Sequence, residues 1–439
     1  MQLTSNYEKI PQCKYKISVE IPYTELQNEY NKVKHEIKND ISIPGFRKGK
    51  VPDTILEKRY KPSLQAKVIE NILPRAYKQI LEDKSLKTFG QPEAKNISEY
   101  KEGAPLKAEF TVDRMPSCTI NNSKRFAVNK DYYIVEEQDL ETEIKRTIRR
   151  KADIKNYEGP AKEGDILKID IKVENDDLKD TSLSDYSLEL NNNSHVPFDL
   201  FDELKGIKTG QTKKVSKNYN KKYKDQRLAG KKVNFSITAK EIKAVTYPDL
   251  TDELARELQY KDIADMRSKI KSQLQALARQ RTDDLLKKKI LEELRKETNF
   301  EIPQSIIDYT TQQYIQQFKM QFGNNEQLAE NFLKNAKQNG RDIYKEYKEM
   351  ALYNIENDLI TEKIIKDNNI EVPEEKIREE INQIAVRSGQ EPKQLKKEML
   401  KSGGYTNLKN KLLDKEAINF IASQNKLKEG KKINIITAT

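Results

Sequence analysis

Between two predicted helices the chain reads IPGFRKGKVP at positions 43–52. Its Pro-Gly pair predicts a tight turn, so we expect this segment to form an exposed loop tip. Phe46 stands directly before Arg47 and Lys48, and Lys50 adds a third cation. An aromatic side chain beside arginine is typical of a binding hot spot, where the ring is buried in a partner and the cations pair with phosphate or carboxylate. The segment therefore predicts a docking loop.

Two other interpretations explain this loop less well. A phosphate-binding P-loop needs four residues between its glycines and a Ser or Thr after the lysine. Here Gly45 and Gly49 enclose three residues, and Val51 follows Lys50. A merely solvated turn would leave the aromatic ring of Phe46 without a partner. The docking interpretation is therefore favoured.

The composition of the whole chain limits the partners without choosing one. Its 439 residues are typical of about three domains of roughly 150 residues each. Charged residues make up 34% and apolar residues 36%, with no tryptophan, which predicts much surface relative to core, as in an elongated helical protein. A formal charge of +11 admits nucleic acid, the ribosome or an anionic membrane surface. A solvated Lys/Glu surface also accounts for most of these charges.

The sequence predicts neither a secretory signal nor a membrane span. The first ten residues, MQLTSNYEKI, lack the basic and then apolar pattern of a secretory signal. No stretch approaches the ~20 apolar residues of a membrane span. Cys13 and Cys118 lie far apart and predict no disulfide framework. These features predict a soluble cytosolic protein.

The first part of the chain mixes strand and helix patterns. Apolar and polar residues alternate over 14–21 and 106–112, which is the period of half-buried strands. Residues 24–27 read TELQ, a capping box that predicts a helix start at Thr24. A second helical stretch over 64–77 carries Pro74, which we expect to interrupt it. This part is expected to be an α+β domain.

The rest of the chain changes from strand to helix patterns. Residues 138–151 are amphipathic and predict a connecting helix, and short strands are predicted over 166–173, 186–190 and 233–237. From Leu250 to about Lys426 the apolar period is helical. The segments NFEIP (299–303) and NIEVP (369–373) each follow one helix and open another, because proline suits a first helical turn. We expect two helical arms of related design.

The docking loop resembles the ribosome-binding signature of trigger factors, G-F-R-x-G-K-x-P, at every fixed position. The resemblance implies ribosome binding by Gly45, Phe46, Arg47, Lys48, Gly49, Lys50 and Pro52. YPDLTDE at 247–253 resembles the family's junction between isomerase domain and arms, and FEIP at 300–303 with QFG at 321–323 resembles its first arm. The resemblance covers nearly the whole chain.

The resemblance implies a multidomain α+β protein of elongated shape. The expected domains are a ribosome-binding α+β domain (residues 1–118), a linker helix (119–150), a small β-rich domain similar to FK506-binding proteins (151–247), and all-α chaperone arms (248–439). In FK506-binding proteins an apolar, aromatic pocket twists an X-Pro bond, whose rotation barrier is ~20 kcal/mol in the free amide. The resemblance assigns to this pocket Tyr186, Val196, Phe201, Tyr223 and Phe235, with Asp170 as the acid beside them.

The pocket sequence departs from the family pattern at several positions. Ile171 stands where the family has an aromatic, and Val173 replaces a glycine. The family's I-P-G-F reads VPFDLF at 196–201, with one extra residue and no glycine. Two interpretations stay open, namely a working pocket and a barrel core with little activity.

The function that the resemblance implies is that of an ATP-independent chaperone without a cofactor. Its partners would be the large ribosomal subunit near the peptide exit tunnel and unfolded nascent polypeptides in the cytoplasm, with a homodimer off the ribosome and no membrane. Adaptable side chains would contact clients, since methionine repacks readily. The candidate methionines of the arms are Met266, Met320, Met350 and Met399.

Two other functions remain as alternatives. The chain could be primarily a prolyl isomerase. The pocket substitutions are the feature that discriminates this enzyme from a chaperone with little isomerase activity. A nucleic-acid-binding protein is suggested by charge alone, because the sequence lacks stacking repeats and any nucleic-acid-binding motif. The two histidines, His35 and His195, are not near a cysteine, so no zinc-type site is predicted.

Overall fold

The structure, a computed structural model, divides into two compact units. One contains Met1–Asn129 and Leu286–Lys428, and the other contains Lys130–Leu285 and Glu429–Thr439. The residues that the structure describes are 1–41, 44, 46, 49–121, 126–175, 178, 182–191, 196–221, 223, 225, 227–323, 325–338 and 340–436.

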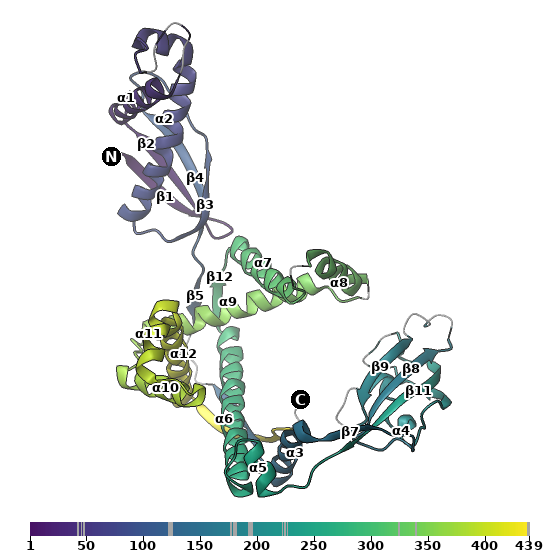
Figure 1. The fold of residues 1–439 in the computed structure, drawn as a ribbon. Coiled ribbons are helices and arrows are strands. Elements are labelled where there is room, and N and C mark those ends of the chain that lie inside the picture. Colours follow the sequence, from purple (N-terminus) through teal and green to yellow (C-terminus); the bar gives the residue numbers. More distant parts are fainter. Residues whose placement is uncertain are drawn as a thin grey trace. The chain divides into compact units, whose positions relative to one another are not determined.

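The first unit begins with a four-stranded antiparallel sheet. Its elements are β1 (Thr4–Ile10), β2 (Lys14–Ile21), β3 (Thr88–Lys95) and β4 (Leu106–Arg114), with the helices α1 (Tyr23–Asp40) and α2 (Asp53–Asp83). The strand order is β1-β2-β4-β3, and α2 runs along one face of the sheet (Figure 1). Ile17 pairs with Phe110 and Val19 with Ala108, and all four side chains are buried. The predicted alternation over 14–21 and 106–112 is thereby confirmed.

Two sequence predictions about these helices are wrong. Helix α1 begins at Tyr23 after Pro22, no side chain caps it, and Thr24 lies inside its first turn. Burial of Leu26 and Val33 in the core stabilises this start instead. Helix α2 continues through Pro62 and Pro74, although proline removes a helical hydrogen bond. Its apolar face is buried on both sides of Pro74, and this packing outweighs the local loss. The buried residues of that face are Leu56, Leu64, Val68, Ile72, Leu73, Ala76 and Ile80.

The C-terminal part of the first unit is mainly helical. Its elements are β5 (Ser117–Ile120), β12 (Thr298–Glu301), α7 (Gln304–Met320), α8 (Glu326–Gln338), α9 (Ile343–Asp367), α10 (Glu374–Ser388), α11 (Pro392–Ser402) and α12 (Gly404–Gln424). Pro303 and Pro373 directly precede α7 and α10, as the repeated segments predict. β12 pairs antiparallel with β5, a strand pair that the helical period did not predict.

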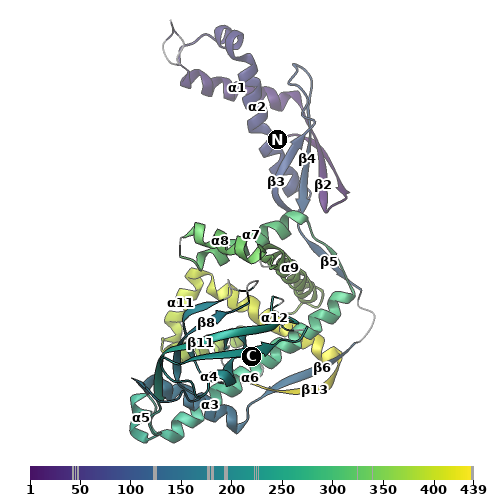
Figure 2. The ribbon, with the colours of Figure 1, turned by 90° about the vertical axis from the view of Figure 1, so that its right-hand side faces the viewer.

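Some elements cross the border between the two units. They are α6 (Ile263–Lys296), β6 (Ala127–Ile134) and β13 (Lys426–Asn434). β6 and β13 form a two-stranded sheet and lie side by side in Figure 2. In the first unit the end of α6 packs with α9 and α12 around Ile290, Ile360 and Ile418.

In the second unit, α3 (Glu137–Ile148), α5 (Asp252–Glu257) and the start of α6 share another core. Leu140, Leu254 and Ile270 belong to it, together with Met266, whose side chain is fully buried. Met266 is therefore a core residue here, and its prediction as an adaptable contact for clients is wrong. The connecting helix predicted over 138–151 corresponds to α3 and the short 3-10 turn at Arg149–Lys151.

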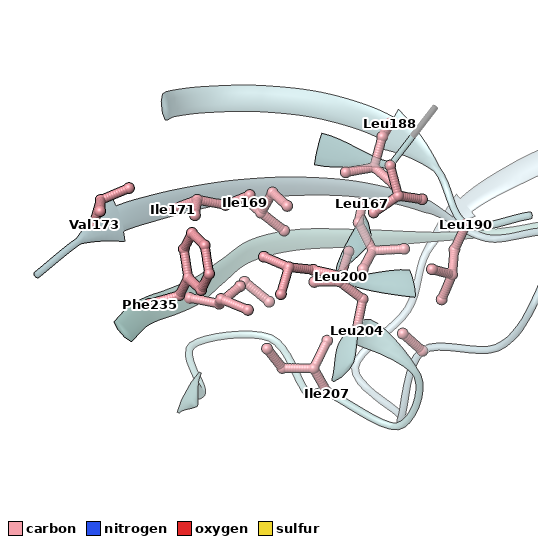
Figure 3. Packing of buried hydrophobic residues seen from close by; sticks show 14 of the residues in the cluster. Leu167, Ile169, Ile171, Val173, Leu188, Leu190, Leu200, Leu204, Ile207 and Phe235 are labelled. Carbon is pink, nitrogen blue, oxygen red and sulfur yellow. The ribbon is translucent and has the colours of Figure 1, made fainter. Parts of the chain in front are cut away.

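The second unit also contains a five-stranded antiparallel sheet. Its elements are β7 (Asp153–Asn156), β8 (Ile166–Val173), β9 (Leu183–Glu189), the 3-10 turn η3 (Pro197–Asp199), α4 (Phe201–Leu204), β10 (Thr212–Asn218) and β11 (Lys232–Thr246). The order is β10-β11-β8-β9, and β7 also pairs with β11. Figure 3 shows Ile169, Ile171 and Val173 in a row along β8, with Phe235 beside this row and Leu200 and Leu204 below it.

These elements agree with the predicted fold class. A helix-and-sheet part comes first, a β-rich part follows, and a mainly helical part ends the chain. The strands β12 and β13 are additions to a C-terminal part that was expected to be all helical. The predicted α+β multidomain fold is confirmed.

Candidate functional site

The docking loop starts and ends on two helices whose ends are joined by ion pairs. Lys38 Nζ in the last turn of α1 lies 2.8 Å from Asp53 Oδ1 in the first turn of α2. Lys34 Nζ lies 3.2 Å from Asp53 Oδ2 and 3.3 Å from Glu57 Oε1. Hydrogen bonds from Lys38 and Lys34 lower the pKa of Asp53. The base of the loop is therefore held closed by charge.

Gly49 completes the closure of the loop. Its φ of 79° lies in the left-handed region, which favours glycine. Its N–H donates to the carbonyl oxygen of Lys38 at 3.2 Å. A Cβ at this position would lie 3.3 Å from Asn39 Oδ1, which is a tight contact. The glycine of the signature thus has a local structural reason.

Phe46 differs from the exposed ring that the sequence predicted. It is half-buried and packs against the hydrophobic core of the first sheet and its helices. Pro44, Lys50 and Pro52 are exposed, and Pro52 directly precedes α2. Gly45, Arg47 and Lys48, also predicted for this site, lie outside the described residues. The described part of the loop therefore combines an anchored ring with an exposed cation.

Most of the residues predicted for the prolyl pocket gather on one hydrophobic core. Phe235 on β11 is fully buried and Val196 before η3 is 7% exposed. Tyr186, Phe201 and Tyr223 are half-buried and pack against the same core. The structure thus brings five of the six predicted side chains to one apolar cluster.

Asp170 is the exception, because its side chain lies on the other face of the sheet. Its neighbours Ile169 and Ile171 on β8 are fully buried, and successive residues of a strand point to opposite faces. Asp170 Oδ1 accepts the N–H of Asp185 at 2.7 Å and lies 2.9 Å from Lys240 Nζ. These two contacts lower the pKa of Asp170. The acid therefore belongs to a surface charge cluster and not to the apolar cluster.

Two aromatic residues of the cluster were missed by the sequence analysis. The ring centroid of Phe198 lies 5.1 Å from that of Phe235, and Tyr219 lies 6.4 Å from Phe235 and 4.5 Å from Tyr223. Tyr219 could have been found from alternation, because it continues the inward positions Val215 and Lys217 of β10. No sequence signal marks Phe198, since its backbone has an unusual left-handed φ of 58°.

The side chains of Tyr219 and Phe201 make different kinds of contact. The Tyr219 hydroxyl donates to the carbonyl oxygen of Phe198 at 2.8 Å. Burial, followed by the neighbouring Tyr223, raises the pKa of Tyr219, so the hydroxyl keeps its proton. Burial and a hydrogen bond with Asp199 likewise raise the pKa of Tyr223 to about 12. The Phe201 ring instead faces a cation, with Lys205 Nζ 4.3 Å from its centroid.

The described residues offer no cluster of three or more His, Cys, Asp and Glu side chains that could hold a metal ion. His195 lies outside this part of the chain. Within the same described ranges, no helix is both long and apolar enough to cross a membrane.

Two family models match the chain on either side of the β-rich part. The model of the bacterial trigger factor protein matches residues 3–147, and the model of the trigger factor C-terminus matches residues 262–423. Together they cover well over half of the sequence. The chain belongs to the trigger factor family.

Individual relatives agree over almost the full length. A trigger factor from Natranaerobius thermophilus is 28% identical over 437 residues, covering 98% of both chains. One from Syntrophomonas wolfei is 26% identical over 441 residues, covering 99% of this chain and 100% of the relative. A solved structure of a trigger factor chaperone covers 95% of this chain and 99% of its own, with 19% identity and a TM-score of 0.48.

Trigger factors are ribosome-associated chaperones, and this chain is one of them. The family also carries a peptidyl-prolyl isomerase domain. The two family models leave residues 148–261 of this trigger factor between them, and the apolar cluster around Phe235 lies in that interval.

Proposed function

We propose that this trigger factor docks on the large ribosomal subunit near the peptide exit tunnel and shields nascent polypeptides without ATP. The docking residues are Gly45, Phe46, Arg47, Lys48, Gly49, Lys50 and Pro52. The observation that carries the proposal is the position of this sequence, between the ends of α1 and α2, where ion pairs from Asp53 hold the base of the loop closed. The cations suit ribosomal RNA phosphates or acidic protein side chains.

The half-buried ring of Phe46 fits this role. Its contact with the domain core fixes the loop, while its exposed edge remains available to a partner. Central aromatic anchors typically cost about 2 kcal/mol or more when truncated. Loss of the ring should therefore raise the rate of dissociation from the ribosome.

Co-sedimentation with large ribosomal subunits tests the docking proposal. We expect Phe46→Ala, Arg47→Ala and Lys48→Ala, combined in one chain, to abolish co-sedimentation. The matched control is Lys84→Ala with Lys87→Ala, which likewise removes two positive charges, here from exposed side chains at the other end of α2. Retained co-sedimentation of the triple variant would refute the assignment of the loop. An equal loss of co-sedimentation in the control would show that net charge, and not the loop, determines binding.

The proposal divides the chain into a docking domain (residues 1–118), a linker (119–150), an isomerase-like domain (151–247) and helical arms (248–439). Separate hydrophobic cores support the borders of the docking domain and of the isomerase-like domain. Among the described residues, the core around Phe235 draws on positions 157–242 and the core around Ile17 and Phe110 on positions 3–112. The proposal also puts the chain in the cytoplasm, where nascent polypeptides emerge, and allows a homodimer off the ribosome.

Exposed apolar side chains on the arms support client binding. Met320 is 69% exposed, Leu328 52% and Phe332 45%. The rings of Phe318, Phe322 and Phe332 lie within 5.3–5.8 Å of one another, from centroid to centroid. Flexible and aromatic side chains of this kind tolerate varied partners. Many weak contacts would give promiscuous and readily reversible binding.

We further propose that residues 151–247 catalyse prolyl cis–trans isomerisation. The reaction needs an apolar site that holds the twisted amide, and no titrating acid or base. The aromatic cluster around Phe235 supplies such surfaces, and Asp170 takes no part because it lies on the other face of the sheet. Isomerisation of a proline tetrapeptide by the full chain tests this activity. A rate equal to the uncatalysed rate would refute it.

A further inference from the structure

We propose that Phe198 is an internal plug of the prolyl pocket, occupying the place that the proline ring of a peptide would take against Phe235. This inference rests on the proposed isomerase activity and names the residue that controls access to it. A peptide could then bind only when the Phe198 ring has moved away from Phe235.

The first observation is that Phe235, the most buried ring of the predicted pocket, has no free surface. Phe235 is 0% exposed, although a ring that receives a ligand must offer one face to it. Phe198 covers it at 5.1 Å between centroids and 35° between ring planes, which is a tilted stack. Tyr219 meets Phe235 at 78°, edge to face. A proline ring needs such an aromatic face, and Phe198 occupies it.

The second observation is that two polar contacts hold the backbone of the plug segment. The Tyr219 hydroxyl donates to the Phe198 carbonyl oxygen at 2.8 Å, and Lys217 Nζ donates to the carbonyl oxygen of Asp199. Both donors come from the strand β10 or directly after it. The segment with the plug is thus fastened to a neighbouring strand by two carbonyl groups, and these contacts can break without disrupting the sheet.

The third observation is that the plug segment has an unfavourable backbone. Phe198 has φ 58° and ψ 19°, and Asp199 follows with φ 53°. This region is unfavourable for residues other than glycine, and surrounding contacts must maintain it. The unfavourable backbone biases the segment toward release once its contacts are broken.

Phe201 does not compete for this role. Its ring lies under Lys205 Nζ at 4.3 Å, and no ring contact joins it to Phe235 among the described residues. The one-residue insertion in VPFDLF therefore puts Phe198, and not Phe201, on the aromatic wall.

The decisive variant is Phe198→Gly, because glycine suits the left-handed backbone and removes the plug. We measure isomerisation of a proline tetrapeptide and binding of the same peptide to the full chain. We expect kcat/KM to rise about tenfold. This is the gain if about one tenth of the wild-type molecules have the ring moved away and all molecules of the variant can bind the peptide. The matched control is Tyr157→Ala, which removes a half-buried ring from the same core near the other end of β11, where Tyr157 N–H donates to Ile242. The control should show no gain.

A second variant covers the case in which Phe198→Gly fails to fold. Tyr219→Phe keeps every ring and removes only the hydroxyl that holds the Phe198 carbonyl. We expect about a fivefold gain in peptide affinity, the factor that one hydrogen bond of typical net strength gives. Equal or lower peptide binding in every variant that folds would overturn the plug. Inactivity of the wild-type chain alone would refute the isomerase proposal, but a gain in peptide binding on unplugging would still support the plug.

Discussion

Lys38 Nζ and Asp53 Oδ1 lie 2.8 Å apart and join the last turn of α1 to the first turn of α2. Each charge also suits its helix end, since cations favour a C-terminus and anions an N-terminus. Fourteen residues of sequence separate the two side chains, and that interval contains the docking loop. The ion pair therefore fixes the distance across which the loop must close.

Asp53→Asn should weaken ribosome binding without abolishing it. The change removes the ion pair of Lys38 with Asp53 and one of the two ion pairs of Lys34, which keeps Glu57, so the loop base loosens. Exposed pairs of this kind contribute about 0.2–1 kcal/mol, which corresponds to at most about a fivefold loss of affinity. The loss should be larger at low salt, where charges are less screened. Titration of fluorescent protein with ribosomes measures it.

Glu70→Gln is the matched control for this variant. Glu70 pairs with Lys67 within α2, and among the described residues no ion pair joins it to another element. If Asp53→Asn bound ribosomes at low salt as tightly as the wild type does, the ion pairs would not organise the loop.

Tyr186→Ala should lower isomerase activity by about tenfold, because an aromatic wall contributes about 1 kcal/mol or more to the bound state. Tyr186 packs against the core of the isomerase-like domain, and the docking loop lies in the other compact unit. Ribosome affinity should therefore remain unchanged. Isomerase activity and ribosome affinity are measured for Tyr186→Ala alone and for Tyr186→Ala combined with Phe198→Gly. Unchanged kcat/KM in both backgrounds would remove Tyr186 from the pocket.

Glu29 makes the stability of the docking domain depend on pH. Burial by itself raises the pKa of this carboxyl, but hydrogen bonds from Arg75 and Asn71 outweigh it and lower the pKa. A pKa that is lower in the folded than in the unfolded chain stabilises the fold above the ordinary pKa. This stabilisation is lost as the pH falls through the folded pKa. Glu29→Gln should therefore destabilise the domain by about 1–3 kcal/mol at neutral pH, and by less in acid.

Hydrogen exchange of the α1 amides, compared between about pH 7 and about pH 4, measures this difference. The control is Glu36→Gln, an exposed carboxylate on the same helix, for which little change is expected. A destabilisation by Glu29→Gln that was independent of pH would contradict the charge-based explanation.

Leu328→Ser with Phe332→Ser should weaken suppression of client aggregation several-fold. Both side chains are exposed on α8, so their loss removes apolar surface, together with the ring contacts of Phe332 with Phe318 and Phe322. The interior of this region, around Ile315, Leu333 and Ile343, stays intact. Light scattering of a refolding client measures the effect. Full suppression by this variant would exclude α8 as a client surface.

Strong periodicity made much of the fold predictable. The strand over 14–21 was found because one of its faces is buried, and the helices from Leu250 onward were found from their apolar period. β12 was missed because it has only four residues, and its partner β5 lies far away in sequence. Pro74 was misread, since the buried face of α2 is a tertiary effect that local propensity does not contain.

The site was predictable to a different extent. Buried apolar positions such as Phe235 and Val196 follow from strand pattern and resemblance. The resemblance assigns Asp170 to the pocket, whereas strand alternation in β8 sends its side chain to the opposite face. Phe198 could not be found, because the left-handed backbone that turns its ring onto Phe235 is stabilised by the distant Tyr219.

The central claim of this account is that the loop between α1 and α2 contacts the ribosome. A photo-crosslinking amino acid at Lys50, which is exposed, tests it on ribosomes that carry a nascent chain. Lys84, exposed at the far end of α2, is the control position. We predict crosslinks from position 50 to a large-subunit component at the tunnel exit and none from position 84. Crosslinks from position 50 to the small subunit, or none at all while the chain co-sediments with ribosomes, would contradict the account.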